Sequence, residues 1–198
     1  MGKVVAIEHL SLDGVMQGPA RPDEDRRGGF AHGGWGAAGG ADPALQPIIG
    51  AHMGAAWSLL VGRVTYTDFA SVWPSAPQPN SFTDPLNNAQ KFVVSNTLSE
   101  PLPWVNSTLL QGDGADAVAR LKPEHAKTLV IFGSGALVQS LLRRDLIDEL
   151  VLQIHPLALG SGRRLFAEDG QLTNFTLTEA ITTGGGVIVA TYRPVSAR

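Results

Sequence analysis

The chain has no cysteine, no long uninterrupted apolar run and no excess of basic residues. Among its 198 residues, 15 are lysine or arginine and 18 are aspartate or glutamate, so the net charge is −3. The absence of cysteine excludes disulfides, thiolate metal sites and a cysteine nucleophile. The longest uncharged stretch, residues 43–62, carries two prolines, three glycines, Gln46 and His52. It is therefore too polar and too broken to span a bilayer.

These absences restrict the partners and the location that we expect. The scattered basic residues give no electrostatic footprint for nucleic acid, and nothing favours a membrane partner or a metal. Met1–Lys3 lead directly into a strand-like apolar run and not into a signal peptide. We predict a single domain over residues 1–198, located in the cytoplasm.

Two common nucleotide-binding motifs are also missing, although a glycine turn is present. Gly133 and Gly135 follow a strand-like run, 128–132, that is apolar on both faces, and a helical pattern begins after them. Val138 stands where a third glycine would complete the dinucleotide fingerprint, and there is no Walker motif. The free N–H groups of such a helix suit a phosphate, but the glycines could also serve only a tight turn. Ser134 could cap the helix or donate to that phosphate.

A second glycine junction follows the strand predicted over 57–61. Gly62 ends that strand, and apolar residues recur at helical spacing from Tyr66 onward. Arg63 and Thr65 add a guanidinium and a hydroxyl, a pair suited to a phosphate monoester. Alternatively, Arg63 pairs with Asp68 on the helix surface.

The first strand, Lys3–Ser11, alternates between two faces, and its apolar start predicts a central position. Asp13 follows it in an Asp-Gly turn, at a strand end where open α/β sheets bind ligands. It is either a substrate contact or a turn aspartate that bonds its own backbone. His9, inside the strand, is either a packed histidine or an acid/base group.

The Gly-rich segment 17–41 is too long for an ordinary connection. Phe30 and Trp35 could dock it while its glycines keep it mobile, so we expect a lid, with a flexible surface insertion as the alternative. A helix should follow from Asp42 or Pro47, with Ile49, Met53 and Ala56 on its buried face.

The remaining predicted elements complete an α/β pattern. Strands alternate with helices up to the sixth strand, which favours a three-layer α-β-α domain around a mostly parallel sheet with an antiparallel C-terminal edge. The other predicted segments are strands over 91–95, 106–110 and 148–155, a helix over 115–121, a closing pair over 172–181 and 187–193, and a loop over 74–88.

Six short motifs in this order resemble the dihydrofolate-reductase-like fold, in the branch of the bacterial riboflavin-biosynthesis reductase (RibD C-terminal domain). They are Ser11–Val15, Leu60–Tyr66, Val93–Thr97, Ile131–Leu137, Leu146–Glu149 and Pro156–Gly162.

The resemblance implies a homodimeric oxidoreductase that uses NADPH to reduce a small heterocyclic or carbonyl substrate. The reductase of 5-amino-6-(5-phosphoribosylamino)uracil is the named member of that class. Asp13 matches the aspartate of that branch's motif and is the implied catalytic candidate, and His9 and His155 are further candidates. The implied cofactor contacts are Gly62, Arg63, Thr65, Ser95, Asn96 and Thr97 near the adenosine 2′-phosphate, and Gly133, Ser134, Gly135, Ala136 and Leu137 under the pyrophosphate.

One departure from the fold's best-known members narrows the function. Dihydrofolate reductases carry an acidic residue in the helix after the mobile loop, and residues 44–57 contain none. Dihydrofolate reduction is therefore disfavoured. A non-catalytic nucleotide-binding module remains the alternative from another class.

Overall fold

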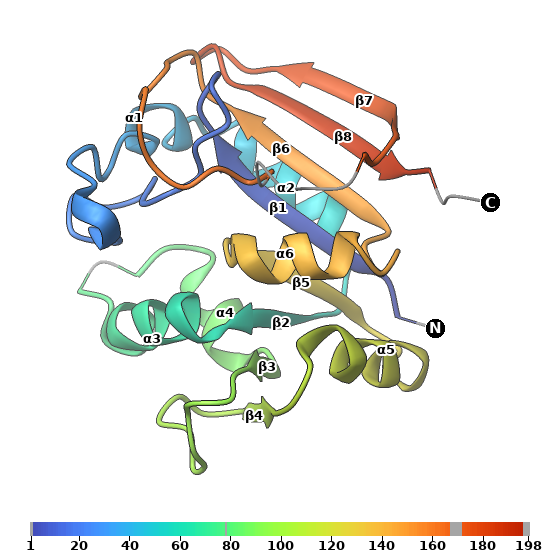
Figure 1. Cartoon of the computed structure of the whole chain (residues 1–198). Coiled ribbons are helices and arrows are strands. Elements are labelled where there is room, and N and C mark those ends of the chain that lie inside the picture. The colour runs from blue at the N-terminus through green and yellow to red at the C-terminus, as the bar shows by residue number, and fades with distance from the viewer. Residues whose placement is uncertain (1, 78, 167–171, 196–198) are drawn as a thin grey trace.

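The computed structural model describes residues 2–77, 79–166 and 172–195, in which eight strands form one mixed sheet (Figure 1). The strands are β1 (Val4–Leu10), β2 (Trp57–Gly62), β3 (Lys91–Val94), β4 (Ser107–Leu110), β5 (Thr128–Phe132), β6 (Glu149–Ile154), β7 (Phe175–Thr182) and β8 (Ile188–Pro194). The α-helices are α1 (Ala37–Gly40), α2 (Leu45–Met53), α3 (Arg63–Val72), α4 (Thr83–Asn88), α5 (Gly114–Glu124) and α6 (Gly135–Leu142). Short 3₁₀ turns cover Arg27–Gly29 and Trp73–Ser75.

The strand order is β4-β3-β2-β5-β1-β6-β8-β7. The first six strands in the chain pair in parallel, whereas β8 pairs antiparallel with both β6 and β7. The predicted parallel sheet with an antiparallel C-terminal edge is thus confirmed. Because the first six strands run the same way, their carboxyl ends share one edge of the sheet, and the loops after them leave from that edge.

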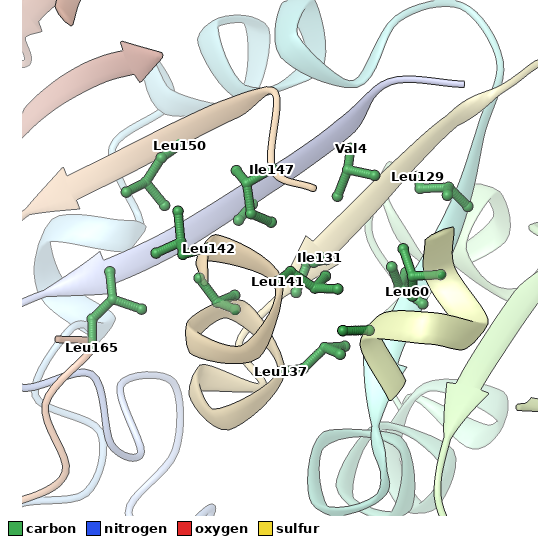
Figure 2. Close-up of a cluster of buried hydrophobic side chains, with 14 of the residues drawn as sticks. Val4, Leu60, Leu129, Ile131, Leu137, Leu141, Leu142, Ile147, Leu150 and Leu165 are labelled. Carbon is green, nitrogen blue, oxygen red and sulfur yellow. The ribbon is translucent and has the colours of Figure 1, made fainter. Parts of the chain in front are cut away.

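Helices cover both faces of the sheet and make three layers. On one face, α5 and α6 close a core to which β1 contributes Val4, Ala6 and Leu10 (Figure 2). On the other face, α2, α3 and α4 cover two further clusters, and β1 contributes Val5 and Ile7. Burying this apolar surface from both sides is the main favourable term in folding, and it explains why β1 lies in the middle of the sheet.

Two details of the predicted fold were wrong. The region 74–88, expected to be a loop, contains helix α4, on which Thr83 and Leu86 are buried. Ala56 does not lie on the buried face of a helix, because α2 ends at Met53 and Ala56 is exposed. The region 74–88 is rich in proline and asparagine, which indicated a loop, and α4 is too short to show a periodic pattern.

Candidate functional site

The two glycine junctions lie in direct contact at the carboxyl edge of the sheet. The Gly62 backbone N–H donates to Ser134 Oγ at 2.9 Å, and Ser134 Oγ donates to Thr65 Oγ1 at 2.9 Å. Strands β2 and β5 are neighbours in the sheet, so α3 and α6 begin side by side. First-turn N–H groups of two helices and their partial positive charges therefore converge on one place, which suits an anion.

The Gly133 turn keeps part of its backbone free for a ligand. Gly133 and Ser134 both have positive φ, 69° and 66°, and the left-handed pair swings the chain from β5 into α6. The N–H of Leu137 donates to the Ser134 carbonyl, which leaves the earlier N–H groups of Gly135 and Ala136 outside the helical pattern. Of the two roles considered for Ser134, the helix cap is wrong, because its side chain makes no cap hydrogen bond and instead connects α6 to the Gly62 junction.

Arg63 is exposed at the start of α3, and it does not pair with Asp68. Asp68 is held instead by Arg21 from the 17–41 segment, with Nη2 to Oδ1 at 2.5 Å and Nη1 to Oδ2 at 3.3 Å. The alternative in which Asp68 neutralises Arg63 is therefore wrong. The Arg63 guanidinium is available to a ligand next to the converging helix ends.

The third polar strand end is largely occupied by its own hydrogen bonds. Ser95 Oγ accepts from the N–H groups of Thr97 and Leu98, both at 3.1 Å. The Asn96 amide bonds both the N–H and the carbonyl of Gly112, at 2.7 and 3.1 Å. Asn96 and Thr97 are exposed, while Ser95 is buried. The side chains of Ser95 and Asn96 therefore hold the loop after β3 in shape. Thr97 is exposed and makes the fewest hydrogen bonds of the three within the protein.

The Asp13 carboxylate connects the turn after β1 to the loop at 159–160 by hydrogen bonds. Its Oδ1 accepts from Ser11 Oγ at 2.7 Å and from the Leu159 N–H at 3.0 Å, and its Oδ2 accepts from the Gly160 N–H at 2.8 Å. Arg164 Nη2 lies 3.7 Å from Oδ2. These hydrogen bonds, with Ser11 as the largest cause, lower the pKa of Asp13 to about 2.

The geometry therefore restricts what Asp13 can do chemically. It bonds Ser11 of its own turn as well as the Leu159 and Gly160 N–H groups of a distant loop, and it is an anion at neutral pH. Oδ2 keeps one acceptor position for a further donor, such as a substrate hydroxyl.

His9 forms a pair with His155, with Nδ1 of His9 2.8 Å from Nε2 of His155. The Gln153 amide lies 3.4 Å from His9 Nε2. If that amide nitrogen donates, neutral His9 carries its proton on Nδ1 and donates to His155. Burial, and secondarily His155, lowers the pKa of His9 to about 4, so both rings are uncharged at neutral pH. Sequence reasoning did not pair these two residues, which lie 146 positions apart.

The 17–41 segment is docked over this histidine pair. Gln17, 4% exposed, donates to the carbonyls of Asp25 and Arg27 and accepts the Arg163 N–H, and its own carbonyl accepts from Trp35. The Trp35 ring then meets the His155 ring edge to face at 5.3 Å. Gly39 approaches so closely that a Cβ there would lie 2.7 Å from His155 Nδ1. The segment is a packed cover and not an unpacked insertion.

Glu8 is a further site residue that the sequence analysis missed. It lies on β1, is 1% exposed, and its carboxyl accepts the backbone N–H of Gly133. A glutamate among Val4, Ala6 and Leu10, on the face of a strand that should be apolar, was the available signal.

Metal and membrane features are missing from the parts of the chain that the structure describes. Across residues 2–77, 79–166 and 172–195, no three His, Asp or Glu side chains gather as metal ligands would. Within the same residues, no helix has the length and apolar character needed to cross a bilayer.

Comparison with known proteins agrees with this architecture. The class defined by the sheet order, the two glycine junctions and the docked loop is the dihydrofolate-reductase-like α/β fold. Dihydrofolate reductase from Enterococcus faecalis, complexed with NADP(H), superposes with a TM-score of 0.61 over 98% of both chains at 14% identity, which shows the fold alone.

The family model described as the RibD C-terminal domain matches residues 3–189, and the chain belongs to this family. A putative riboflavin biosynthesis protein from Shewanella sp. PV-4 is similar over 99% of this chain and 100% of its own, with 25% identity and a TM-score of 0.69. The uncharacterized protein YyaP of Bacillus subtilis is 26% identical over 141 residues, 68% of this chain and 72% of its own length.

Proposed function

We propose that this protein is an NADPH-dependent oxidoreductase that reduces a small heterocyclic or carbonyl substrate. The observation that carries the proposal is the contact between the two glycine junctions through Gly62, Ser134 and Thr65, with the exposed Arg63 beside it. Two helix N-termini and a guanidinium at one place suit a ligand with more than one phosphate group. Membership of the RibD C-terminal domain family supports a reductase.

The residues present fit a phosphorylated dinucleotide. The free N–H groups of Gly135 and Ala136 would hold the pyrophosphate. A Cβ on Gly62 would contact Ser134 and one on Gly133 would contact Thr65, so the two glycines leave room between the junctions. Arg63, with Thr97 and the loop shaped by Ser95 and Asn96, would hold the 2′-phosphate. When bound, NADPH supplies a hydride. The protein supplies position, electrostatics and exclusion of water.

The substrate side is proposed to lie at Asp13, His9 and the docked segment. An aspartate with a pKa of about 2 can accept a bond from a substrate hydroxyl, but it does not donate a proton at neutral pH. Neutral His9 has one ring proton, which it donates to His155, so it would donate to a substrate only after the substrate replaces His155 as its partner. Arg164, beside Asp13, is the basic residue placed to meet a substrate phosphate such as that of the aminouracil ribose phosphate.

One observation favours a second candidate, a non-catalytic nucleotide-binding module. Asp13 and His9 are both engaged with other protein groups under a docked cover. Dihydrofolate reduction has less support, because α2 carries no carboxylate.

Binding and turnover together test the proposal. NADPH and NADH would be titrated into the wild type while the quenching of its four tryptophans is followed. NADPH oxidation would then be followed with dihydrofolate, with aldehydes and ketones, and with the aminouracil ribose phosphate. We expect saturable binding with preference for NADPH, and turnover of a substrate other than dihydrofolate. Binding without any turnover would favour the module, and no binding of NADPH would overturn the proposal.

The proposal includes a homodimer. The supporting feature is β7, an eight-residue strand at the edge of the sheet on which six residues are exposed, Leu177 among them. A long uncovered edge strand is a surface that proteins usually pair or protect. Light scattering should give twice the mass of the chain, and a lysine in place of Leu177 should lower it.

A further inference from the structure

Glu8 lies inside the core, directly behind the Gly133 turn. Side chains alternate along β1, so Glu8 points to the same face as Val4, Ala6 and Leu10, into the cluster beneath α6. It is 1% exposed. A carboxyl group buried among aliphatic side chains is costly unless it is hydrogen-bonded or uncharged.

The hydrogen bonds of Glu8 satisfy only some of the acceptor positions that an ionised carboxylate would have. Its carboxyl accepts the Gly133 backbone N–H, while Oε1 has no partner among the described residues. An ionised carboxylate has about four acceptor positions to satisfy, whereas a protonated one has fewer. Burial raises the pKa of Glu8 well above its ordinary value, and the Gly133 N–H opposes that rise only in part.

Among the residues that the structure describes, no charged side chain compensates this burial. The neighbouring residues on this face are Leu129 and Ile131 of β5, Leu150 and Leu152 of β6, and Leu137, Val138 and Leu141 of α6. The nearest titratable groups along the chain are His9, on the opposite face of β1, then Lys3, which pairs with Glu149, and Asp13, which faces Arg164 at the strand end. No charged group of the described residues is among the causes that shift the pKa of Glu8.

The carboxyl and the phosphate site share one turn. Gly133 offers its N–H inward to Glu8, and two and three residues later Gly135 and Ala136 offer theirs at the start of α6. A negative charge on Glu8 would lie just behind any phosphate held there, in a medium that screens charges poorly.

We propose that Glu8 is a proton-holding positioning residue of the Gly133 turn: it stays uncharged while a dinucleotide phosphate is bound, and its ionisation weakens that binding. The inference rests on the proposed function, because it needs a phosphate-bearing ligand at the turn. It adds a pH dependence that neither the turn nor Arg63 would create alone.

The test is the Kd of NADPH between pH 6 and pH 9.5, followed by tryptophan fluorescence. The wild type is compared with Glu8→Gln, which keeps the shape and cannot ionise, and with Glu124→Gln, the same change at an exposed position on α5. Wild type and Glu124→Gln should lose affinity as pH rises, by at most tenfold per pH unit for one linked proton. Glu8→Gln should show a flatter profile. Titration of the 2′-phosphate itself affects all three proteins alike.

A second measurement needs no variant. Calorimetry of NADPH binding in two buffers of different ionisation enthalpy should show net proton uptake by the wild type at alkaline pH. Parallel pH profiles in wild type and Glu8→Gln, or no proton uptake, would overturn the inference and leave the proposed function standing. Absence of NADPH binding at every pH would overturn both.

Discussion

The carboxyl edge of the sheet has two regions that differ in whether their polar groups are free or are bonded to other protein groups. On one side, formed by 62–65 and 133–137, where we propose that phosphate binds, Arg63 is exposed and the first N–H groups of α6 are outside the helical pattern. On the lid side, formed by His9, Asp13 and the 17–41 segment, the polar groups bond one another beneath the packed cover. We infer that a cofactor can bind without rearrangement, whereas a substrate reaches His9 only after the cover moves.

Glu8 gives the largest expected effect, through the dependence of stability on pH. In the native state its carboxyl keeps a proton that the unfolded chain releases above about pH 4.3. Raising the pH from there to the native pKa therefore favours unfolding, by about 1.4 kcal/mol per pH unit for one proton. Glu8→Gln has no such proton to lose. The free energy of unfolding of Glu8→Gln, relative to that of the wild type, should therefore increase from pH 5 to pH 7. Urea unfolding at both values measures the difference.

Asp13→Asn tests a carboxyl whose pKa is shifted in the direction opposite to that of Glu8. The pKa of Asp13 is lowered, so its stabilising bonds are present above the unfolded pKa of about 3.9 and are lost as pH falls towards 2. The wild type should thus exceed Asp13→Asn in thermal stability at pH 6, and the gap should close on acidification. If both variants shift with pH in the same direction, the contrast between the two carboxyls is wrong.

Two matched glycine substitutions test the packing of the cover. A Cβ at Gly39 would lie 2.7 Å from His155 Nδ1 and from Val187 Cγ2, whereas Gly50, in α2, has nothing within 4 Å. Gly39→Ala should lower stability by about 1–3 kcal/mol and expose 17–41 to limited proteolysis. Gly50→Ala should raise stability by about 0.5–1 kcal/mol, because alanine favours the helix. NADPH affinity should change little in either variant.

The ion pair between Arg21 and Asp68 gives the smallest effect. It ties the cover to α3, but its side chains are 32% and 17% exposed, so screening limits its value. A double-mutant cycle with Arg21→Ala and Asp68→Ala should give a coupling energy of about 0.5–1 kcal/mol in unfolding experiments. Coupling that vanishes would mean that the ion pair adds nothing to the other contacts of the cover, such as those of Gln17 and Trp35.

The fold could be predicted because its signals are local. The two-sided apolar run before Gly133 indicated a buried parallel strand, and the alternation in Lys3–Ser11 gave the two faces of β1 correctly. The order of strands and helices was enough to predict the sheet with its antiparallel edge. Helix α4 was missed because six residues are too few to display a period.

The site could be predicted only in outline, because its contacts join residues far apart in sequence. The convergence of the glycine junctions follows from a parallel sheet, but the bond from Ser134 to Thr65 spans 69 positions and no local pattern encodes it. The same holds for Asp13 with Gly160 and for His9 with His155. The cap expected of Ser134 failed because its hydroxyl is used in such a distant contact.

The most direct test of the central claim is the affinity of Arg63→Ala for NADPH and for NADH, with Arg120→Ala, an exposed arginine on α5, as the control. Losing a charged partner of a phosphate should cost about 1.5–3 kcal/mol, so the Kd for NADPH should rise roughly tenfold or more. The Kd for NADH, and both values in Arg120→Ala, should barely change. Equal losses for the two nucleotides, or no loss in Arg63→Ala, would contradict a 2′-phosphate site at the start of α3.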